Sequence, residues 1–358
     1  MRTKNLVLLG SLLLTFNMFS QNPNLHIYLC LGQSKMKAYP IKFEPILKER
    51  IWGGEKLIQI FKKKSDKNNI GESWEISDVE GAVSIVENGE LKGQSLRDLL
   101  KKFKGEFVGH KVYEQFGDDF PVLIKFIDAK TPLSIQVHPN NELAKERHNS
   151  FGKNEMWYIM DCDKDAAIIV GFNKEVSKEE YLNVLEEGKV LNILNSEKIK
   201  AGDTFYIPTG RVHAIGSGTV IAEIQQTSDV TYRIYDYERI DASTGQQREL
   251  HTDLSLDAID YKLYGNYKTA YEIQENKSVT LVHSPYFKTD VIEVKGAVYQ
   301  NYSDLDSFVI YVCVAGSYEI EMDGKRVLVN KGETVFLPAN STEVVLRANE
   351  ARILEVYF

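Results

Sequence analysis

Short runs of apolar, β-branched and aromatic residues, separated by Gly, Asn and Asp, recur along the chain from residue 40 onward. Ala82–Glu87 and Phe308–Val314 are typical of these runs, whose composition indicates β-strands. Only two segments, Ser95–Phe103 and Ser177–Glu187, show a convincing helical pattern. The hydrophobic pattern therefore predicts an all-β protein with two small helical insertions.

Each helical segment begins with a serine that can cap it. Ser95 precedes a set of apolar residues on one helical face: Leu96, Leu99, Leu100 and Phe103. Ser177 and Glu180 have the spacing of a capping box, and the residues that follow place an apolar set inward: Tyr181, Leu182 and Leu185.

One sequence pattern occurs twice. Residues 202–210 read GDTFYIPTG and residues 332–340 read GETVFLPAN, so Gly, an acid, Thr, an aromatic residue and Pro recur at an offset of 130. A β-rich run precedes each copy. The repeat predicts one unit used twice, each copy in its own antiparallel sandwich or barrel; the alternative is chance similarity between Gly-bounded strands. The polar stretch Asp241–Gln247 is the expected end of the first unit.

Composition and charge narrow the class of ligand. The chain has 358 residues, enough for about two domains at roughly 100 to 200 residues each. It carries 43 Lys and Arg against 51 Asp and Glu, a formal charge of −8, with no dense basic block. This balance argues against nucleic acid and favours a small molecule. Three cysteines without paired spacing (Cys30, Cys162 and Cys313) argue against a disulfide scaffold and against a Cys-based zinc site.

The first 35 residues are treated as a leader. Arg2 and Lys4 precede an apolar run that ends at Phe19 and is followed by small and polar residues, which is the pattern of a signal peptide. The run is too short to span a bilayer comfortably as a helix, so no membrane association is expected of the mature protein. A second interpretation places the biological start at Met36, where the first stretch typical of folded protein begins.

A polar stripe is the first candidate for chemistry. In Leu133-Ser-Ile-Gln-Val-His138 the alternation places the apolar residues on one face of a strand and Ser134, Gln136 and His138 on the other. Gln136 and His138 are two residues apart on that face, so one metal ion can accept both the amide oxygen and an imidazole nitrogen. The alternative is a pair of ordinary solvent-facing side chains.

Two further residues complete a metal-ligand set. Glu155 begins a strongly apolar run, where a carboxylate needs a partner or a metal. His213 follows the strand and tight turn at 202–210, whereas the second copy has Glu343 at the matching position. Two imidazoles, one carboxylate and one neutral oxygen suit zinc and leave room for water or substrate, and two His with one carboxylate also suit non-haem iron.

A third alternating segment, Ile221–Asp236, contains a candidate acid and a candidate cation. It places Glu223 on one face and Arg233 on the strand after a turn at Ser228-Asp229. A carboxylate, an arginine and a metal around one cavity can bind and isomerise an anionic sugar. The alternative is that Glu223 and Arg233 form an exposed pair on a sheet, which contributes little.

These segments resemble the cupin superfamily and, more closely, the short bacterial form of the type I mannose-6-phosphate isomerases. The resemblance rests on residues 132–139 (PLSIQVHP), 152–158 (GKNEMWY) and 225–236 (QQTSDVTYRIYD), and it covers residues 36–358. Trp52-Gly-Gly and Glu72-Ser-Trp-Glu add to it, while Ser217 departs from the Asn expected in the second cupin motif. The resemblance implies two cupin-like jelly-roll barrels: a metal-binding catalytic domain at 36–245 and a degenerate domain without metal at 246–358.

The resemblance also implies the roles of individual residues. The family's ligands for one Zn²⁺ per chain fall on the four residues that the strand pattern indicates: Gln136, His138, Glu155 and His213. The catalytic arginine falls on Arg233, with Asp229 and Glu223 as further catalytic candidates. The substrate-binding candidates are Lys125, Lys153 and Ser134, and the two lysines are expected to contact sugar oxygens or phosphate.

The implied reaction is the reversible conversion of mannose 6-phosphate to fructose 6-phosphate through a cis-enediol, with Glu223 as the first choice of base. A zinc-bound water and a lysine are the other candidates for that role. Because the substrate is a cytoplasmic metabolite, a start at Met36 and a cytoplasmic enzyme are expected; export by residues 1–35 is the alternative. The competing class of function is a metal cupin that does not isomerise, either a sugar-binding module or an iron dioxygenase. The sequence does not indicate an oligomeric state.

Overall fold

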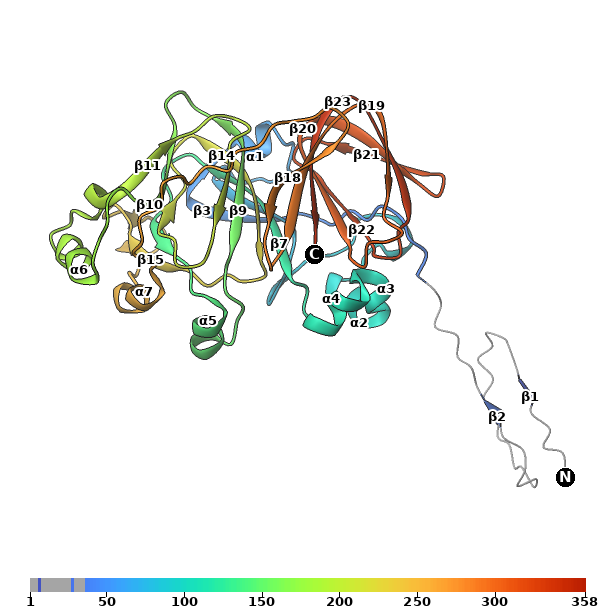
Figure 1. Cartoon of the computed structure of the whole chain (residues 1–358), viewed down its shortest axis with the longest axis horizontal. Coiled ribbons are helices and arrows are strands. Elements are labelled where there is room, and N and C mark those ends of the chain that lie inside the picture. Colours follow the sequence, from blue (N-terminus) through green and yellow to red (C-terminus); the bar gives the residue numbers. More distant parts are fainter. Residues whose placement is uncertain (1–5, 8–26, 29–35) are drawn as a thin grey trace. The chain divides into compact units, whose positions relative to one another are not determined.

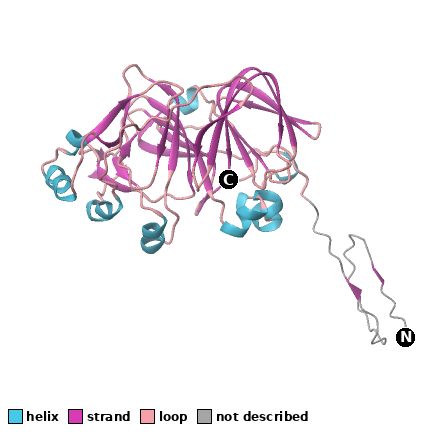
Figure 2. Ribbon diagram, in the orientation of Figure 1, coloured by secondary structure: helices cyan, strands magenta, loops and turns pink. Residues whose placement is uncertain are grey.

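Antiparallel sheets form most of the structure, a computed structural model that describes residues 6–7, 27–28 and 36–358 (Figures 1 and 2). Residues 38–358 make up one compact unit, and the remaining residues make up another. In the latter, β1 (Leu6–Val7) pairs in parallel with β2 (Ile27–Tyr28). The rest of the expected leader lies outside the described residues.

Two sheets form the first half of the large unit. The five-stranded sheet contains, in spatial order, β11 (Leu194–Lys198), β10 (Ala167–Phe172), β13 (His213–Ala214), β8 (Ile135–Val137) and β15 (Tyr232–Tyr235). The six-stranded sheet contains β12 (Thr204–Ile207), β9 (Glu155–Cys162), β14 (Thr219–Gln226), β7 (Val122–Ala129), β3 (Ile46–Gly54) and β4 (Ile70–Ile76). Trp157 and Phe205 of the second sheet pack with Ile168 and Val170 of the first in one buried core. The two sheets therefore face each other as a sandwich.

The second half contains a separate sheet. Its main path is β18 (Ser278–His283), β19 (Lys288–Asn301), β23 (Glu343–Tyr357), β20 (Val309–Met322) and β21 (Lys325–Asn330), with β22 (Thr334–Leu337) paired to β20. Two small hairpins complete the described strands: β5 (Asp78–Val79) with β6 (Ala82–Val83), and β16 (Ile240–Asp241) with β17 (Gln246–Gln247). The run Ala82–Glu87 is thus strand only at its start, and beyond it Ile85 and Val86 form isolated bridges.

The repeated sequence pattern has a structural counterpart. In the first copy β12 pairs with β9, so that Phe205 lies opposite Trp157. In the second copy β22 pairs with β20, so that Val335 lies opposite Tyr311. Continuing both registers places Val309 where the first copy has Glu155. The repeat therefore sets the same strand pairing in both halves, and the all-β fold class is confirmed.

Helices occupy short insertions between the strands. Their bounds are α1 (Lys56–Gln59), α2 (Leu96–Phe103), α3 (Gly105–Val108), α4 (His110–Phe116), α5 (Asn141–His148), α6 (Lys178–Glu186) and α7 (Thr252–Ala258), with 3₁₀ turns at Gly89–Leu91 and Val190–Ile193. The two expected helices are confirmed as α2 and α6, and the side chains of Ser95 and Ser177 accept hydrogen bonds from the backbone N–H groups of Asp98 and Glu180. The sequence pattern missed α5 because Ala144 is its only buried residue, so it has no apolar stripe.

The helices cover particular faces of the sheets. Phe107 of α3 packs on Phe336 of β22, with ring centroids 4.6 Å apart, so α2–α4 lie against the C-terminal sheet (Figure 1). Residues from α6 and α7 pack on the five-stranded sheet. The first unit was expected to end in the polar stretch Asp241–Gln247. Helix α7 follows this stretch and nevertheless contacts β15 of the first unit. Cys162 and Cys313 are free thiols. Within the described part of the chain, no helix has the length and apolarity to cross a bilayer.

Candidate metal centre and active site

The alternation of β8 separates a packing face from a polar face. Ile135 and Val137 pack on the outer side of the five-stranded sheet, in a core that includes Tyr181 of α6. Ser134 and Gln136 point the other way and line a cavity. The polar stripe predicted from the sequence thus faces the inside of the sandwich, because helices cover the opposite face of the strand.

Strand pairing brings distant residues beside this stripe. Gln136 lies opposite His213 of β13 on one side and opposite Arg233 of β15 on the other. Paired residues of an antiparallel sheet point to the same face, so all three side chains are directed toward the six-stranded sheet. Glu155 is fully buried at the start of β9 in that opposing sheet.

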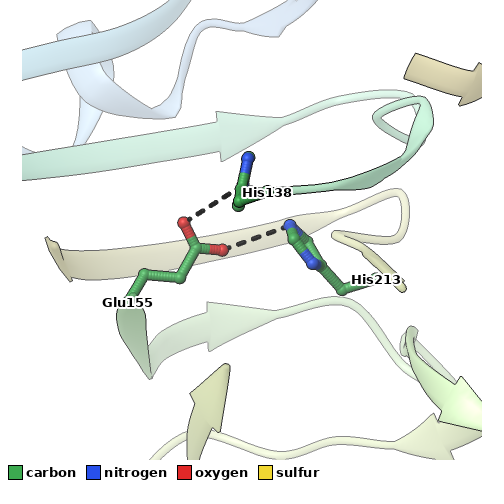
Figure 3. Close-up of side chains that lie close together, drawn as sticks. All are labelled: His138, Glu155 and His213. Atoms are coloured by element: carbon green, nitrogen blue, oxygen red, sulfur yellow. Dashed lines mark ion pairs between the residues drawn. The ribbon is translucent and has the colours of Figure 1, made fainter. Parts of the chain in front are cut away.

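Three buried side chains converge from the two sheets. His138, Glu155 and His213 each offer one ligand atom, and these atoms lie within 4.8 Å of one another. Nε2 of His213 is 3.2 Å from one Glu155 oxygen, and Nε2 of His138 is 3.5 Å from the other (Figure 3). Oε1 of Glu155 is buried and has no hydrogen-bond partner among the residues that the structure describes. An unpartnered buried carboxylate oxygen beside two imidazoles fits a metal ion.

The protonation states of both histidines suit metal binding. Nδ1 of His138 lies 3.0 Å from the carbonyl oxygen of Val230, and Nδ1 of His213 lies 2.8 Å from that of Arg211. Each Nδ1–H therefore donates to a carbonyl oxygen. Nε2 of each ring is then unprotonated, and its lone pair points toward the cluster. Burial lowers the pKa of His213 to about 3 and also lowers the pKa of His138, so both imidazoles are neutral near pH 7.

This pKa shift predicts how the stability of the metal-free protein depends on pH. Above pH 6.5 neither the folded nor the unfolded state protonates His213. Below it the unfolded chain binds a proton that the folded chain rejects until about pH 3, so stability falls as pH falls. Replacing His213 by Gln should make the loss of unfolding free energy between pH 6 and 4 shallower by roughly 1 kcal/mol per pH unit.

Urea unfolding of chelated wild-type and His213→Gln proteins across that range would measure the difference. Parallel pH dependences for wild type and His213→Gln would contradict the assignment of a neutral buried imidazole.

Lys153 lies against the same cluster. Its Nζ is 2.6 Å from Oε2 of Glu155 and 3.0 Å from Nε2 of His138. Burial alone would lower the pKa of Lys153, but Glu155 and Glu223 raise it overall, so the ammonium stays charged. Lys153 and Gln136, which lies 3.3 Å from His213 through its amide nitrogen, both line the cavity and connect it to the cluster.

Glu223 lies in a transverse row of side chains on the six-stranded sheet. The register places Trp74, Lys125, Glu223 and Trp157 side by side on adjacent strands. Glu223 accepts a hydrogen bond of 3.0 Å from Nε1 of Trp157 and lies 3.4 Å from Nζ of Lys125. Burial raises the pKa of Glu223, and the charge of Glu155 raises it further. A carboxylate with a raised pKa in this row is suited to exchange protons near neutral pH.

The exposed-pair interpretation of Glu223 and Arg233 is wrong. Glu223 is only 3% exposed, and the two residues belong to different sheets because the turn at Ser228-Asp229 carries the chain from one sheet to the other. Nη1 of Arg233 donates to the carbonyl of Glu249 at 2.8 Å, and its Nε is buried with no hydrogen-bond partner in the described part of the chain. Asp229 is exposed and stands at the edge of the cavity.

A cavity of about 440 Å³ lies beside the cluster and is lined by Lys153 and Gln136, which contact cluster residues. It contacts every expected catalytic and substrate-binding residue: Lys125, Ser134, Lys153, Glu223, Asp229 and Arg233. It also contains Arg50, Glu72 and Arg248, to which the sequence analysis assigned no role. Burial raises the pKa of Glu72, but Lys125 and Arg50 lower it overall to about 2. The Glu72-Ser-Trp-Glu motif was the sequence signal that could have identified Glu72 as a site residue. Arg248 had no such signal, because it lies in a loop whose position depends on the tertiary structure.

The sandwich and its buried His/Glu/His cluster define the class first: a cupin protein with a candidate metal site beside a cavity lined by both acidic and basic side chains. Two family descriptions match the chain, "Phosphomannose isomerase type I, catalytic domain" over residues 41–173 and "Mannose-6-phosphate isomerase, cupin domain" over residues 277–358. The chain is 37% identical over 307 residues to mannose-6-phosphate isomerase ManA of Bacillus subtilis; this covers 85% of the chain and 94% of that protein.

Other relatives agree. The mannose-6-phosphate isomerase of Streptococcus mutans is 34% identical, with 84% of this chain and 93% of that protein covered. The crystal structure of the mannose 6-phosphate isomerase from Bacillus subtilis superimposes with a TM-score of 0.80 at 33% identity, covering 89% of this chain and 99% of that one. The chain belongs to the type I phosphomannose isomerase family, so by class it is an aldose–ketose isomerase, an intramolecular oxidoreductase. The resemblance stated from the sequence is confirmed.

Proposed function

We propose that the protein is a zinc-dependent mannose-6-phosphate isomerase that converts mannose 6-phosphate reversibly to fructose 6-phosphate. The observation that carries the proposal is that one cavity joins the His138/Glu155/His213 cluster, through Lys153 and Gln136, to the buried carboxylate of Glu223. A proton-transfer group and a candidate metal site are thus within reach of one small molecule.

One zinc ion per chain would be held by Gln136, His138, Glu155 and His213. Two neutral imidazole nitrogens and a carboxylate with an unpartnered oxygen suit zinc better than magnesium or calcium, and a flip of the Gln136 amide, whose nitrogen faces His213 here, would add its oxygen. When bound, zinc supplies a Lewis acid that polarises the carbonyl and hydroxyl oxygens of the open-chain sugar.

The chain's own residues then move and stabilise charge. Glu223 takes the proton from C2 of the opened aldose, the electron pair forms the C1–C2 double bond, and O1 takes up a proton to give the cis-enediol. Glu223 then returns its proton to C1 while the C2 hydroxyl becomes the ketone and releases its proton, which replaces the one taken up by O1. Arg233 stabilises the oxyanion that develops. Lys125, Lys153 and Ser134 contact sugar oxygens, and Asp229 borders the entrance.

Replacing Arg233 by alanine separates an isomerase from a metal-binding sugar module. We expect kcat for fructose 6-phosphate formation to fall about a hundredfold, because a charge-stabilising donor is lost, while bound zinc stays at one per chain. A coupled assay and metal analysis measure both quantities. Unchanged turnover in Arg233→Ala would remove Arg233 from the reaction, and wild-type protein that binds zinc without converting the sugar would overturn the isomerase assignment.

An iron dioxygenase is the second candidate from the donor set alone, but nothing in the family supports it. We also propose that the enzyme works in the cytoplasm, because its substrate is a phosphorylated hexose. The first sandwich, from residue 36 to about residue 245, would carry catalysis together with the segment that follows it through α7, which packs on its five-stranded sheet. The C-terminal domain would be structural, since Val309 and Glu343 stand where the first copy has Glu155 and His213.

A further inference from the structure

Five basic side chains line the cavity: Arg50, Lys125, Lys153, Arg233 and Arg248. Three of them are paired with buried carboxylates: Arg50 with Glu72 at 2.9 Å, Lys125 with Glu223 at 3.4 Å and Lys153 with Glu155 at 2.6 Å. Their charges are therefore largely balanced within the site. A sugar phosphate brings about two further negative charges, and these need cations that are still free to bind them.

The two remaining arginines, Arg233 and Arg248, both line the cavity and lie near enough to each other to interact electrostatically. None of the ion pairs among the described residues involves Arg233, and the only hydrogen bond of its guanidinium there goes to the carbonyl of Glu249. The pKa of Arg233 is lowered by burial and then by the charge of Arg248. Asp241 also lines the cavity, but its Oδ1 is occupied by the backbone N–H and hydroxyl of Ser243.

Arg248 is held in place by one edge of its guanidinium. Nε donates to Oδ2 of Asp236 at 2.8 Å, and Nη2 donates to Oδ1 at 2.5 Å. The same carboxylate also accepts from Nη2 of Arg239 at 2.5 Å, so a single negative charge is shared by two guanidinium groups. Nη1 of Arg248 has no hydrogen-bond partner among the described residues. The second edge of the Arg248 guanidinium therefore remains available, in a side chain that is already fixed.

The backbone sets Arg248 apart from the metal cluster. Arg233 lies opposite Gln136, and its carbonyl accepts a hydrogen bond of 2.7 Å from the N–H of His251. The returning segment from Arg248 to His251 thus runs beside β15, and Arg248 pairs with Asp236, just beyond the end of that strand. Arg233 is placed for the reacting end of a sugar and Arg248 for its far end.

We propose that Arg248, positioned by Asp236, recognises the phosphate group of the substrate. The inference rests on the proposed function and adds the residue that selects a phosphorylated sugar over a neutral one. The free Nη1–Nη2 edge of a guanidinium matches two oxygens of a phosphate, and fixing the other edge lowers the entropy lost on binding. Lys125 and Lys153, whose charges are balanced by buried glutamates, are then left to contact sugar hydroxyl and carbonyl oxygens.

The test compares Arg248→Gln with Arg239→Gln in the zinc-loaded full chain. Arg239 shares Asp236 but does not line the cavity, and its Nη1 donates to the carbonyl of Pro132. For Arg248→Gln we expect KM for mannose 6-phosphate to rise about 10- to 100-fold with kcat within a few-fold of wild type, and the affinity for inorganic phosphate to fall in proportion. Arg239→Gln should change KM less than about threefold. Arg248→Lys keeps the positive charge but loses the bidentate guanidinium, so its KM should lie between those of the wild type and Arg248→Gln.

The outcomes separate this inference from the proposed function. A wild-type protein that converts mannose 6-phosphate while Arg248→Gln and Arg248→Lys keep the wild-type KM would overturn the phosphate role alone. Equal increases of KM in Arg248→Gln and Arg239→Gln would assign the effect to the packing of Asp236 and would also overturn it. A wild type without isomerase activity would remove the proposed function, and calorimetric titration of inorganic phosphate into wild type and Arg248→Gln would still test the anion site.

Discussion

Replacing Glu223 by glutamine is expected to lower kcat at least about a thousandfold while the protein keeps its fold and its full complement of zinc. Glutamine has nearly the same shape and can still contact Nε1 of Trp157, but it cannot accept a proton from carbon. Glu223 does not belong to the buried metal-ligand cluster, so metal binding should be retained. Stopped-flow or coupled assays of fructose 6-phosphate formation, with metal analysis of the same samples, measure both properties.

Two variants act as controls for this result. Glu355 is an equally buried glutamate in the C-terminal sheet, at 4% exposure, and Glu355→Gln should retain kcat if it remains folded. Asp229→Asn tests the exposed acid that lines the cavity, and it should lower kcat far less than Glu223→Gln does. In the wild type, activity should be lost as pH falls through the raised pKa of Glu223, because the base must be unprotonated. Activity retained in Glu223→Gln would move the role of base to another group.

Removal of the metal should abolish the reaction. We expect a chelator to reduce turnover below detection and stoichiometric zinc to restore it, because the carbonyl of the substrate would no longer be polarised. His213→Ala should be inactive and should bind zinc weakly even at high concentration, since it removes one of the two imidazoles. Metal analysis and thermal unfolding with and without zinc measure the site independently of turnover, because a ligand that binds only the folded state raises the melting temperature.

A matched histidine provides the control for the metal site. His283 lies on β18, is exposed and pairs with Asp290, so His283→Ala should bind zinc and turn over substrate as the wild type does. Activity that survives complete chelation would refute the metal requirement. Restoration by ferrous iron alone, together with consumption of oxygen, would support the dioxygenase in place of the isomerase.

Local sequence patterns were informative where one strand or one helix determines the answer. Alternation correctly separated Ile135 and Val137 from Ser134 and Gln136, since side chains of a strand alternate between two faces. It was wrong for Leu133, which precedes β8, packs in the core between the two sheets and lines the cavity. The capping serines located the starts of α2 and α6. Helix α5 was missed because almost none of its surface is buried, so its sequence carries no periodic apolar signal. The metal-ligand set and the roles of the cavity residues stay predictions, now with a geometry that supports them.

The sequence by itself determined the all-β class, the repeated strand pattern and the family, because these depend on residue type and short-range spacing, and it predicted the donor groups of the metal site. Only the tertiary structure decided which face of β8 is interior, that Lys153 lies against both Glu155 and His138, and that Glu223 and Arg233 come from opposing sheets. It also placed Arg248 beside Asp236 at the end of the cavity. The physical reason is that register between strands distant in the chain sets these neighbours, and burial between them sets the pKa of each group.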